Sequence, residues 1–441
     1  MSAGGKSRAF SLPIVHSSIL PKGMKVYALP RPELPLVSIH LMIPRGAEAD
    51  PPGKAGLSNL SAEMLTLGTA KRSASQLAAD IDTLGATLSA HSEWDATYLH
   101  LSGLSEDFER LMGLLLEILT QPAFSPEEFE QLKKRRIAAL GQQKDESQII
   151  ADERFQEALF QGTPYDHPIY GTLKSLPELF CGEVREFFQH SFWPEGSLLV
   201  IVGDVETEAC FRWAEANFPT GTQKENWEGK EFSPLVLSGV KTLLIDRPDL
   251  TQSQIRLGHI GIPHSHPDYL PFEVMNYVLG AGGFSSRLMQ KIRSELGYTY
   301  GIRAFLEPRK RPGPLTISTF TPTETTFSCV REIFSVIKTF IAQGAMDGER
   351  EEAINFLTGS YPLKFETLSQ VAQRILQVEL HGLGLEYLSL YPDRVSAVTL
   401  KEMARTAKQH LHPEKMLVVI VGRAEKFRRE FEELGPAEIW P

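Results

Sequence analysis

Two stretches of sequence, half a chain apart, decide the fold. Residues 194–203 read PEGSLLVIVG, and residues 413–422 read PEKMLVVIVG. Each is a Pro-Glu turn followed by a continuous apolar run of strand length, and a charged, helix-like stretch comes next. The two stretches start 219 residues apart in a chain of 441 residues. This spacing predicts that the chain is an internal duplication.

The elements around the two stretches follow one order, from a strand through two helices and two further strands to a pair of helices. In the first half they are predicted at 36–43, 56–67, 73–84, 86–91 and 96–104, followed by helices from 108 and from Ser125. In the second half they are predicted at 253–260, 269–279, 289–295, 298–305, 315–320 and 325–341, with a last helix from Gly348. Ser73 with Gln76, and Ser125 with Glu128, have the spacing of helix capping boxes.

This order predicts an α+β protein made of two homologous half-domains, each a mainly antiparallel sheet covered by helices. The polar stretch near residues 220–233 has no hydrophobic period and is typical of a linker. We therefore expect an N-terminal tail at 1–19, a first half-domain at 20–220, a linker at 221–235 and a second half-domain at 236–441.

Composition excludes several classes of partner. The formal net charge is −10, so the chain has no basic surplus with which to bind a nucleic acid or an anionic membrane. No apolar run approaches the roughly 20 residues of a membrane helix. Pro13 and His16 interrupt the N-terminal apolar region, which makes a secretory signal unconvincing. Three scattered cysteines lack metal-type spacing. A cytoplasmic protein is expected, or a periplasmic one if a signal peptide has been removed.

Three strings, placed in order along this duplicated chain, resemble one family. They are HPIYGT at 167–172, LGAGGFSSRL at 279–288 and RSELGYTY at 293–300. They closely resemble the pitrilysin-like (insulinase-like) zinc metallopeptidases, or inverzincins, of the mitochondrial-processing-peptidase type, and the resemblance covers almost the whole chain. It implies a zinc site in the first half, with two His ligands and a Glu base in an H-x-x-E-H string and a Glu ligand from a later helix.

That zinc site is degenerate in this chain. Asn59 and Glu63 stand at the two His positions, Ala62 stands at the position of the base, and Ala139 or its neighbour Ala138 stands where the later Glu is expected. Zinc is bound by imidazole, thiolate or carboxylate, so a lone Glu63 is not a site, and an alanine cannot accept a proton. We expect Asn59 and Glu63 to be polar groups on the less apolar face of a helix. No metal is predicted for this chain.

Two H-x-H pairs are the other candidates for metal ligands. They are His264 with His266, and His410 with His412. Neither pair has a third ligand nearby in the sequence, so solvation of a loop is the favoured interpretation of both.

The resemblance assigns a role to Arg293 and Tyr300. In the family, an Arg and a Tyr seven residues later reach the substrate from the second half, and these two residues match that spacing. A Tyr hydroxyl can donate to an oxyanion, and a guanidinium can hold a carbonyl or carboxylate. Taken without the resemblance, Arg293 is a surface charge at a helix C-terminus and Tyr300 is a half-buried strand residue.

The glycine-rich string allows three interpretations. Gly280, Gly282 and Gly283 lack the register of a dinucleotide or phosphate loop. They could form a flexible connection between two helices. The resemblance instead implies a loop that faces the substrate chamber.

These observations lead to one hypothesis and two alternatives. The hypothesis is a zinc-less subunit of a heterodimeric metallopeptidase, which binds no cofactor itself and acts on a peptide or unfolded polypeptide. Its partner would be a homologous chain with an intact H-x-x-E-H and bound zinc, and the peptide would lie as an added strand on a sheet edge. The alternatives are a non-enzymatic scaffold subunit of the core type and a stand-alone peptide-binding protein.

Overall fold

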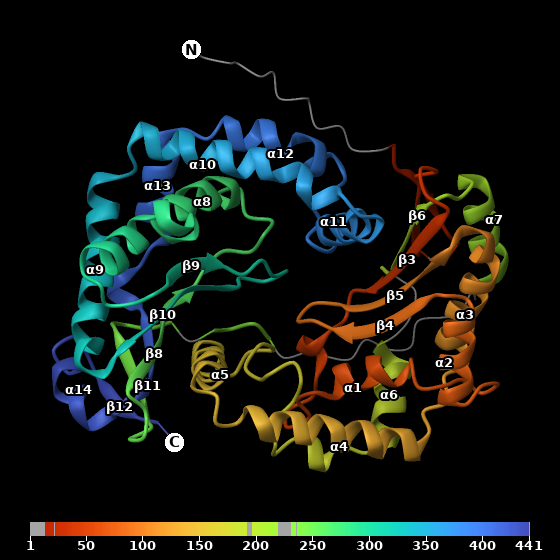
Figure 1. Ribbon diagram of the computed structural model, residues 1–441, viewed down its shortest axis with the longest axis horizontal. Helices are drawn as coiled ribbons and strands as arrows, with labels where there is room; N and C mark the ends of the chain where they lie inside the picture. The colour runs from red at the N-terminus through yellow and green to blue at the C-terminus, as the bar shows by residue number, and fades with distance from the viewer. Residues whose placement is uncertain (1–13, 22, 192–195, 219–230, 235, 441) are drawn as a thin grey trace.

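The computed structural model describes residues 14–21, 23–191, 196–218, 231–234 and 236–440. These residues form two six-stranded sheets with helices around them, so the α+β duplication predicted from the sequence is confirmed (Figure 1). The expected linker at 221–235 lies outside the described residues except for 231–234.

The first sheet is built from strands of the first half. Its strand order is β1-β2-β6-β3-β5-β4, and only β2 and β6 are parallel neighbours. The strands are β1 (His16–Ile19), β2 (Lys25–Pro30), β3 (Leu36–Ile43), β4 (Thr87–Ser92), β5 (Thr97–Leu104) and β6 (Leu198–Gly203). Because β1 begins at His16, the sheet takes in part of the tail expected at 1–19.

The second sheet repeats this arrangement. Its order is β12-β7-β11-β8-β10-β9, with β7 parallel to β11 and to β12 and the other neighbours antiparallel. The strands are β7 (Lys241–Asp246), β8 (Gln252–Ile260), β9 (Ile302–Leu306), β10 (Pro314–Pro322), β11 (Leu417–Gly422) and β12 (Ala437–Ile439).

Each sheet has one face covered by helices of its own half. Six helices share a core with the first sheet: α1 (Leu57–Met64), α2 (Ala74–Thr83), α3 (Phe108–Thr120), α4 (Pro126–Gln143), α6 (Cys181–Ser191) and α7 (Thr207–Asn217). Helices of the second half that share a core with the second sheet include α8 (Tyr269–Asn276), α9 (Thr326–Gln343), α10 (Asp347–Ser360), α12 (Glu386–Ser396), α13 (Leu400–His410) and α14 (Ala424–Phe431).

The other face of each sheet is covered by a helix from the opposite half. Helix α5 (Ser147–Leu159) belongs to the first half but packs on β8 and β11. Helix α11 (Leu368–Leu380) belongs to the second half but packs on β3 and β6. Figure 1 shows α11, in blue, next to the red strands of the first half, and α5, in gold, near the green strands of the second. The two halves thus exchange one helix each.

This exchange explains why both repeated strands are apolar at every position. In β6, Val200 joins the core that contains α11, whereas Leu199 and Ile201 join the core of the first half. In β11, Val419 packs with α5, whereas Val418 faces the helices of the second half. Successive strand residues point to opposite faces, so a strand that is covered on both faces must be apolar throughout.

An ion pair accompanies each exchanged helix. Arg256 on β8 is 1% exposed and pairs with Asp152 of α5 through two contacts. Lys25 on β2 pairs with Glu379 of α11 at 2.8 Å. A buried guanidinium needs such a partner, so Arg256 fixes where α5 docks on the sheet.

Most of the predicted elements are observed, with two corrections in the second half. Ser73 and Gln76 form the capping box of α2, and the Ser125 side chain accepts the Glu128 N–H at the start of α4. However, β9 begins at Ile302 and not at residue 298. The helical segments Tyr277–Ala281 and Met289–Glu295 are π-helical. In the described part of the chain, no helix is long and apolar enough to cross a membrane.

The exchange predicts that the first half is unstable without α11. A chain that ends after Phe218 lacks this helix and exposes one face of β3 and β6, including Val200. We expect this fragment to aggregate or to bind a hydrophobic dye, and a fragment of residues 219–441 supplied in trans to suppress both effects. A monomeric first-half fragment that unfolds cooperatively by itself would contradict the requirement for α11.

Buried histidines predict that the fold is sensitive to acid. Burial lowers the pKa of His40 to about 3, with a further contribution from His100, and it lowers the pKa of His259 to about 4. His264 and His381 are affected in the same way. Because the folded chain keeps these imidazoles neutral, their stabilisation is complete above the ordinary pKa of about 6.5 and is lost as the pH falls below it.

Urea unfolding between pH 7 and pH 4 measures this effect. Each such histidine should lower the free energy of unfolding by up to about 1.4 kcal/mol per pH unit. His40→Gln should therefore reduce the slope, and His91→Gln, which changes an exposed histidine on β4, should not. If the free energy of unfolding of His40→Gln falls with pH as steeply as that of the unmodified chain, the acid sensitivity does not come from His40.

Candidate functional site

Helix α1 carries Asn59, Ala62 and Glu63, the positions at which the resemblance places the metal-binding string. It begins after Gly56, which has a φ of 92°. The buried carboxylate of Asp50 accepts the backbone N–H groups of Gly56 and Ser58, each at 2.8 Å. Burial raises the pKa of Asp50 to about 6, while nearby His167 opposes the rise. Asp50 thus takes up N–H groups that a helix start leaves without partners.

A guanidinium stands where the sequence left a metal site incomplete. Arg136 of α4 forms an ion pair with Glu63 and donates through Nη2 to Oδ1 of Asn59 at 3.4 Å. Its guanidinium also lies 4.8 Å from the centre of the Tyr170 ring. The sequence analysis did not identify Arg136. The sequence could have pointed to Arg136, because it lies one helical turn before Ala139, where the third metal ligand was expected. Residues one turn apart on a helix lie on the same face.

The residues at this position do not fit zinc. An amide, an alanine and a single carboxylate form no zinc ligand set, and the cation of Arg136 already neutralises that carboxylate. The description of Asn59 as a residue on a polar helix face is wrong, because Asn59 is only 1% exposed. Ala62 is fully buried. Arg136 therefore links α1 to α4 with its own positive charge.

A cavity of about 760 Å³ lies between the two halves. Ser89 and His91 of β4 line it on one side, Arg374 and His381 line it on the other, and Tyr170 brings it next to Arg136. β4 is the last strand of its sheet, and in the described part of the chain its one neighbour is β5. The cavity thus has a sheet edge along its wall.

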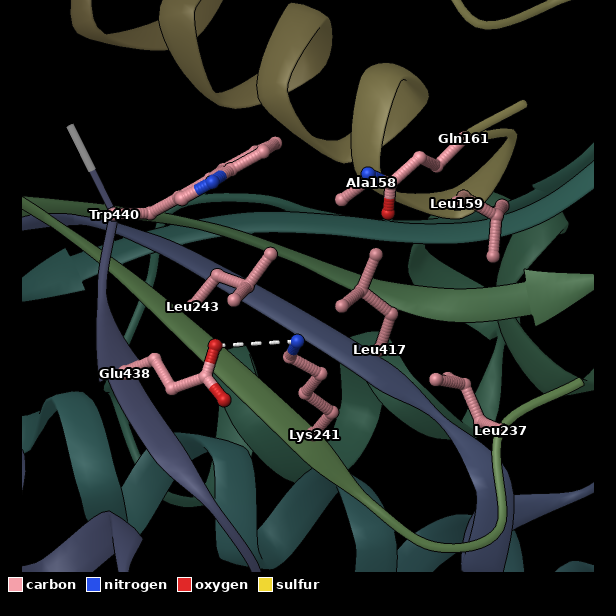
Figure 2. Close-up of a pocket in the computed structure, with 9 residues that line it drawn as sticks. All are labelled: Ala158, Leu159, Gln161, Leu237, Lys241, Leu243, Leu417, Glu438 and Trp440. Carbon is pink, nitrogen blue, oxygen red and sulfur yellow. Dashed lines mark ion pairs between the residues drawn. The ribbon is translucent and has the colours of Figure 1, made fainter. Parts of the chain in front are cut away.

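A second, smaller cavity of about 200 Å³ lies beside β7, β11 and β12. Leu243 and Leu417 line it, with Trp440 on one side and the ion pair between Lys241 and Glu438 on another (Figure 2). None of the site residues predicted from the sequence lines it.

Arg293 and Tyr300 lie at the surface of the second half. Tyr300 is 78% exposed and precedes β9, so its description as a half-buried strand residue is wrong. The Arg293 guanidinium lies 4.4 Å from the ring centre of Phe284, which is itself exposed. No hydrogen bond or ring contact between Arg293 and Tyr300 is found in the described part of the chain. Neither residue lines the cavity between the halves.

Two of the three glycines are needed for packing. A Cβ on Gly280 would lie 2.8 Å from the backbone nitrogen of Ala304 in β9, and a Cβ on Gly282 would lie 2.8 Å from the carbonyl oxygen of Tyr277. Gly283 has a φ of 59° and open space around it. A flexible connection therefore does not describe Gly280, which is buried in a π-helical segment.

The two H-x-H pairs do not act as pairs. The His264 ring lies 4.5 Å from the His381 ring, and the His412 ring lies 5.2 Å from that of His259. The remaining members, His266 and His410, come together with Asp268. The expectation that neither pair has a third possible ligand nearby was wrong. Asp268 lies two residues from His266 in the sequence, and the fold brings it next to His410.

Comparisons with known proteins agree with this architecture. The family model described as "Insulinase (Peptidase family M16)" matches residues 26–173, and the model described as "Peptidase M16 inactive domain" matches residues 181–357. The chain belongs to peptidase family M16. The resemblance found in the sequence is thus confirmed, and an M16 chain without the metal-binding string is of the inactive type.

Some relatives of this M16 chain are named as zinc proteases, and others are named as non-peptidase homologues. A Helicobacter pylori protein named "Non-peptidase homolog YmxG" is 26% identical over 396 residues, which are 89% of this chain and 90% of that protein. A Rickettsia bellii protein named "Uncharacterized zinc protease" is 27% identical over 300 residues, 68% of this chain and 72% of that one. Among solved structures, a Pseudomonas fluorescens "peptidase M16 inactive domain" has a TM-score of 0.84 at 24% identity and covers 92% of this chain and 98% of its own.

The contacts of Arg136 predict its importance for stability. Arg136→Ala leaves Glu63 and the buried oxygen of Asn59 without this donor, which should lower the free energy of unfolding by about 1–3 kcal/mol in urea melts. Arg135→Ala, at an exposed position on the same helix, should change it by less than about 0.5 kcal/mol. Equal effects of the two variants would show that the pair with Glu63 contributes nothing.

Proposed function

We propose that this M16 chain is the subunit of a two-chain metallopeptidase that lacks the catalytic zinc site, and that it contributes Arg293 and Tyr300 to a site completed by its partner. The partner is a homologous chain with an intact H-x-x-E-H string, and the substrate is a peptide or an unfolded polypeptide. The observation that carries the proposal is the exposure of Tyr300 in a chain whose degenerate metal position holds the ion pair of Arg136 with Glu63.

The position of β9 supports action on a partner. Tyr300 precedes this strand, whereas Glu307 and Arg309, which line the chain's own cavity, follow it. Five strand residues at about 3.3 Å each separate the two ends by about 17 Å. Tyr300 and the cavity therefore serve different surfaces, and a side chain that is mostly exposed is free to meet a second chain.

The chemistry assigned to each group follows from its donors. The Tyr300 hydroxyl donates to the oxygen that gains negative charge as the peptide carbonyl is attacked. The Arg293 guanidinium, supported by its contact with Phe284, holds a peptide carbonyl or carboxylate through its planar set of donors. The partner supplies the metal, the base and the water.

Among the described residues β4 has a free edge, and this edge supports an extended bound peptide. A strand that lacks a neighbour on one side presents unpaired N–H and C=O groups, and a peptide can add to it as a further strand. Ser89 and His91 of this edge also line the cavity between the halves. Gly283, exposed in the glycine-rich string, is proposed to contact the substrate from the second half.

The same cavity favours a second candidate, a peptide-binding protein that works without a partner. This candidate requires no role for Arg293 or Tyr300. A scaffold subunit of the core type likewise leaves these two residues without a function, so their variants separate the three hypotheses.

The proposal predicts a large loss of turnover on removal of one hydroxyl. In the complex reconstituted with the H-x-x-E-H homologue, Tyr300→Phe should lower cleavage of a fluorogenic peptide by roughly 10²-fold or more, because one oxyanion donor is lost. Arg293→Ala should also weaken peptide binding. This chain alone should show no chelator-sensitive cleavage. Steady-state kinetics at equal heterodimer concentration provides the measurement.

Tyr298→Phe is the matched control, since it removes an aromatic hydroxyl two residues away. It should leave turnover and association unchanged. Full turnover in both site variants would support the scaffold, whereas tight peptide binding by the isolated chain, independent of both residues, would support the peptide-binding protein.

A further inference from the structure

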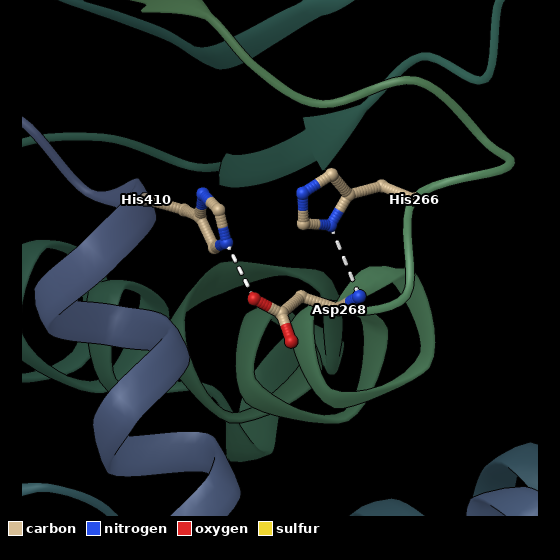
Figure 3. Close-up of side chains that lie close together, drawn as sticks. All are labelled: His266, Asp268 and His410. Atoms are coloured by element: carbon tan, nitrogen blue, oxygen red, sulfur yellow. Dashed lines mark hydrogen bonds and ion pairs between the residues drawn. The ribbon is translucent and has the colours of Figure 1, made fainter.

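Three side chains in the second half converge outside the family's metal position. His266 lies in the loop before α8, Asp268 is the residue before that helix, and His410 ends α13. One ligand atom from each of the three lies within 4.8 Å of the other two (Figure 3). Nε2 of His410 is 2.8 Å from Oδ2 of Asp268, and the two imidazole rings are 5.1 Å apart.

We propose that His266, Asp268 and His410 bind a divalent transition-metal ion of the Zn²⁺ type. Two imidazoles and one carboxylate are ligands that zinc and its neighbours prefer, whereas Mg²⁺ and Ca²⁺ favour sets made of oxygen atoms. Two ligands about 2.0–2.2 Å from an ion at a tetrahedral angle are roughly 3.4 Å apart. The observed 2.8 Å between His410 and Asp268 needs to widen by only a fraction of an ångström.

Binding exchanges existing contacts for metal ligation. The ion takes the place of the proton between His410 Nε2 and Asp268 Oδ2, and this proton is released, because a ligating imidazole nitrogen must be unprotonated. His266 Nδ1 now accepts the backbone N–H of Asp268 at 3.0 Å. The His266 ring, which is only half-buried in its loop, turns this nitrogen toward the ion.

Arg405 determines which carboxylate oxygen is available. Its guanidinium contacts both oxygens of Asp268, but its side chain is 49% exposed and can withdraw from Oδ2. When the Arg405 guanidinium stays on Oδ1, it holds the Asp268 carboxylate in a fixed orientation. Hydrogen-bond partners of metal ligands commonly have this orienting role. Asp268 itself is 6% exposed, so the carboxylate keeps its place when Oδ2 is taken.

The ion would join two elements that already pack together. Helices α8 and α13 are in contact, and the three ligands connect the loop before α8 to the end of α13. His266 is partly exposed in its loop, which leaves a solvent-facing position for water as a fourth ligand. The bound ion is expected to stabilise the contact between α8 and α13 within the second half. This effect does not depend on the degenerate position in the first half.

Calorimetric titration of the metal-free full-length chain with Zn²⁺ tests the site. We expect one ion per chain, a rise in Tm with Zn²⁺ but not with Mg²⁺, and visible ligand-field absorption with Co²⁺. His410→Gln and His266→Gln should each weaken Zn²⁺ binding by about tenfold or more. The second variant keeps the contact between His410 and Asp268, so a loss of fold in the first does not obscure the result.

Two controls locate the ion. His412→Gln removes the neighbouring histidine that lies outside the cluster, and Glu63→Gln changes the degenerate family position; both should bind Zn²⁺ as the unmodified chain does. The proposal is overturned if the unmodified chain takes up no Zn²⁺, if both cluster variants bind it with unchanged affinity, or if Glu63→Gln abolishes binding.

Discussion

The exchange of one helix between the two halves is the constraint on which the rest of the structure depends. Each sheet has an inner face that its own helices do not reach, and α11 or α5 from the opposite half covers that face. The cavity between the halves exists because α11 stands against the first sheet, and its residues Arg374 and His381 form part of the wall. The pairing of Arg256 with Asp152 fixes the other exchanged helix. Each sheet therefore needs a helix from the opposite half to cover both of its faces.

At the degenerate position, a guanidinium stands where the resemblance places a metal ion. A divalent ion joins ligands from separate helices and neutralises carboxylates between them. Here Arg136 performs both tasks, because it neutralises Glu63, contacts Asn59 and joins α4 to α1. A guanidinium also has a planar face, and Tyr170 covers it. A fixed side chain cannot activate water as an ion does, so the connection between the helices is kept without the chemistry.

The sequence predicted elements well where the signal is local. The repeated strands, the strand at 36–43 and the capping box at Ser73 are observed as expected. What it could not predict depends on tertiary contacts. Helices α5 and α11 have ordinary local sequences, and nothing in them shows that each leaves its own half. Arg136 is one charge among several on α4, and only its approach to Glu63 gives it a role. Asp268 becomes a partner of His410 only because α13 returns to the start of α8.

The tight packing of Gly280 limits what the glycine-rich string at 279–288 indicates about activity. A side chain at this position would collide with the backbone of β9, so any chain that builds this π-helical turn against this strand needs glycine there. The requirement is steric and holds whether or not a metal is bound elsewhere in the molecule. A match to this part of the glycine string therefore identifies the architecture of the second half. It carries no information about whether the subunit that contains it can cleave a peptide.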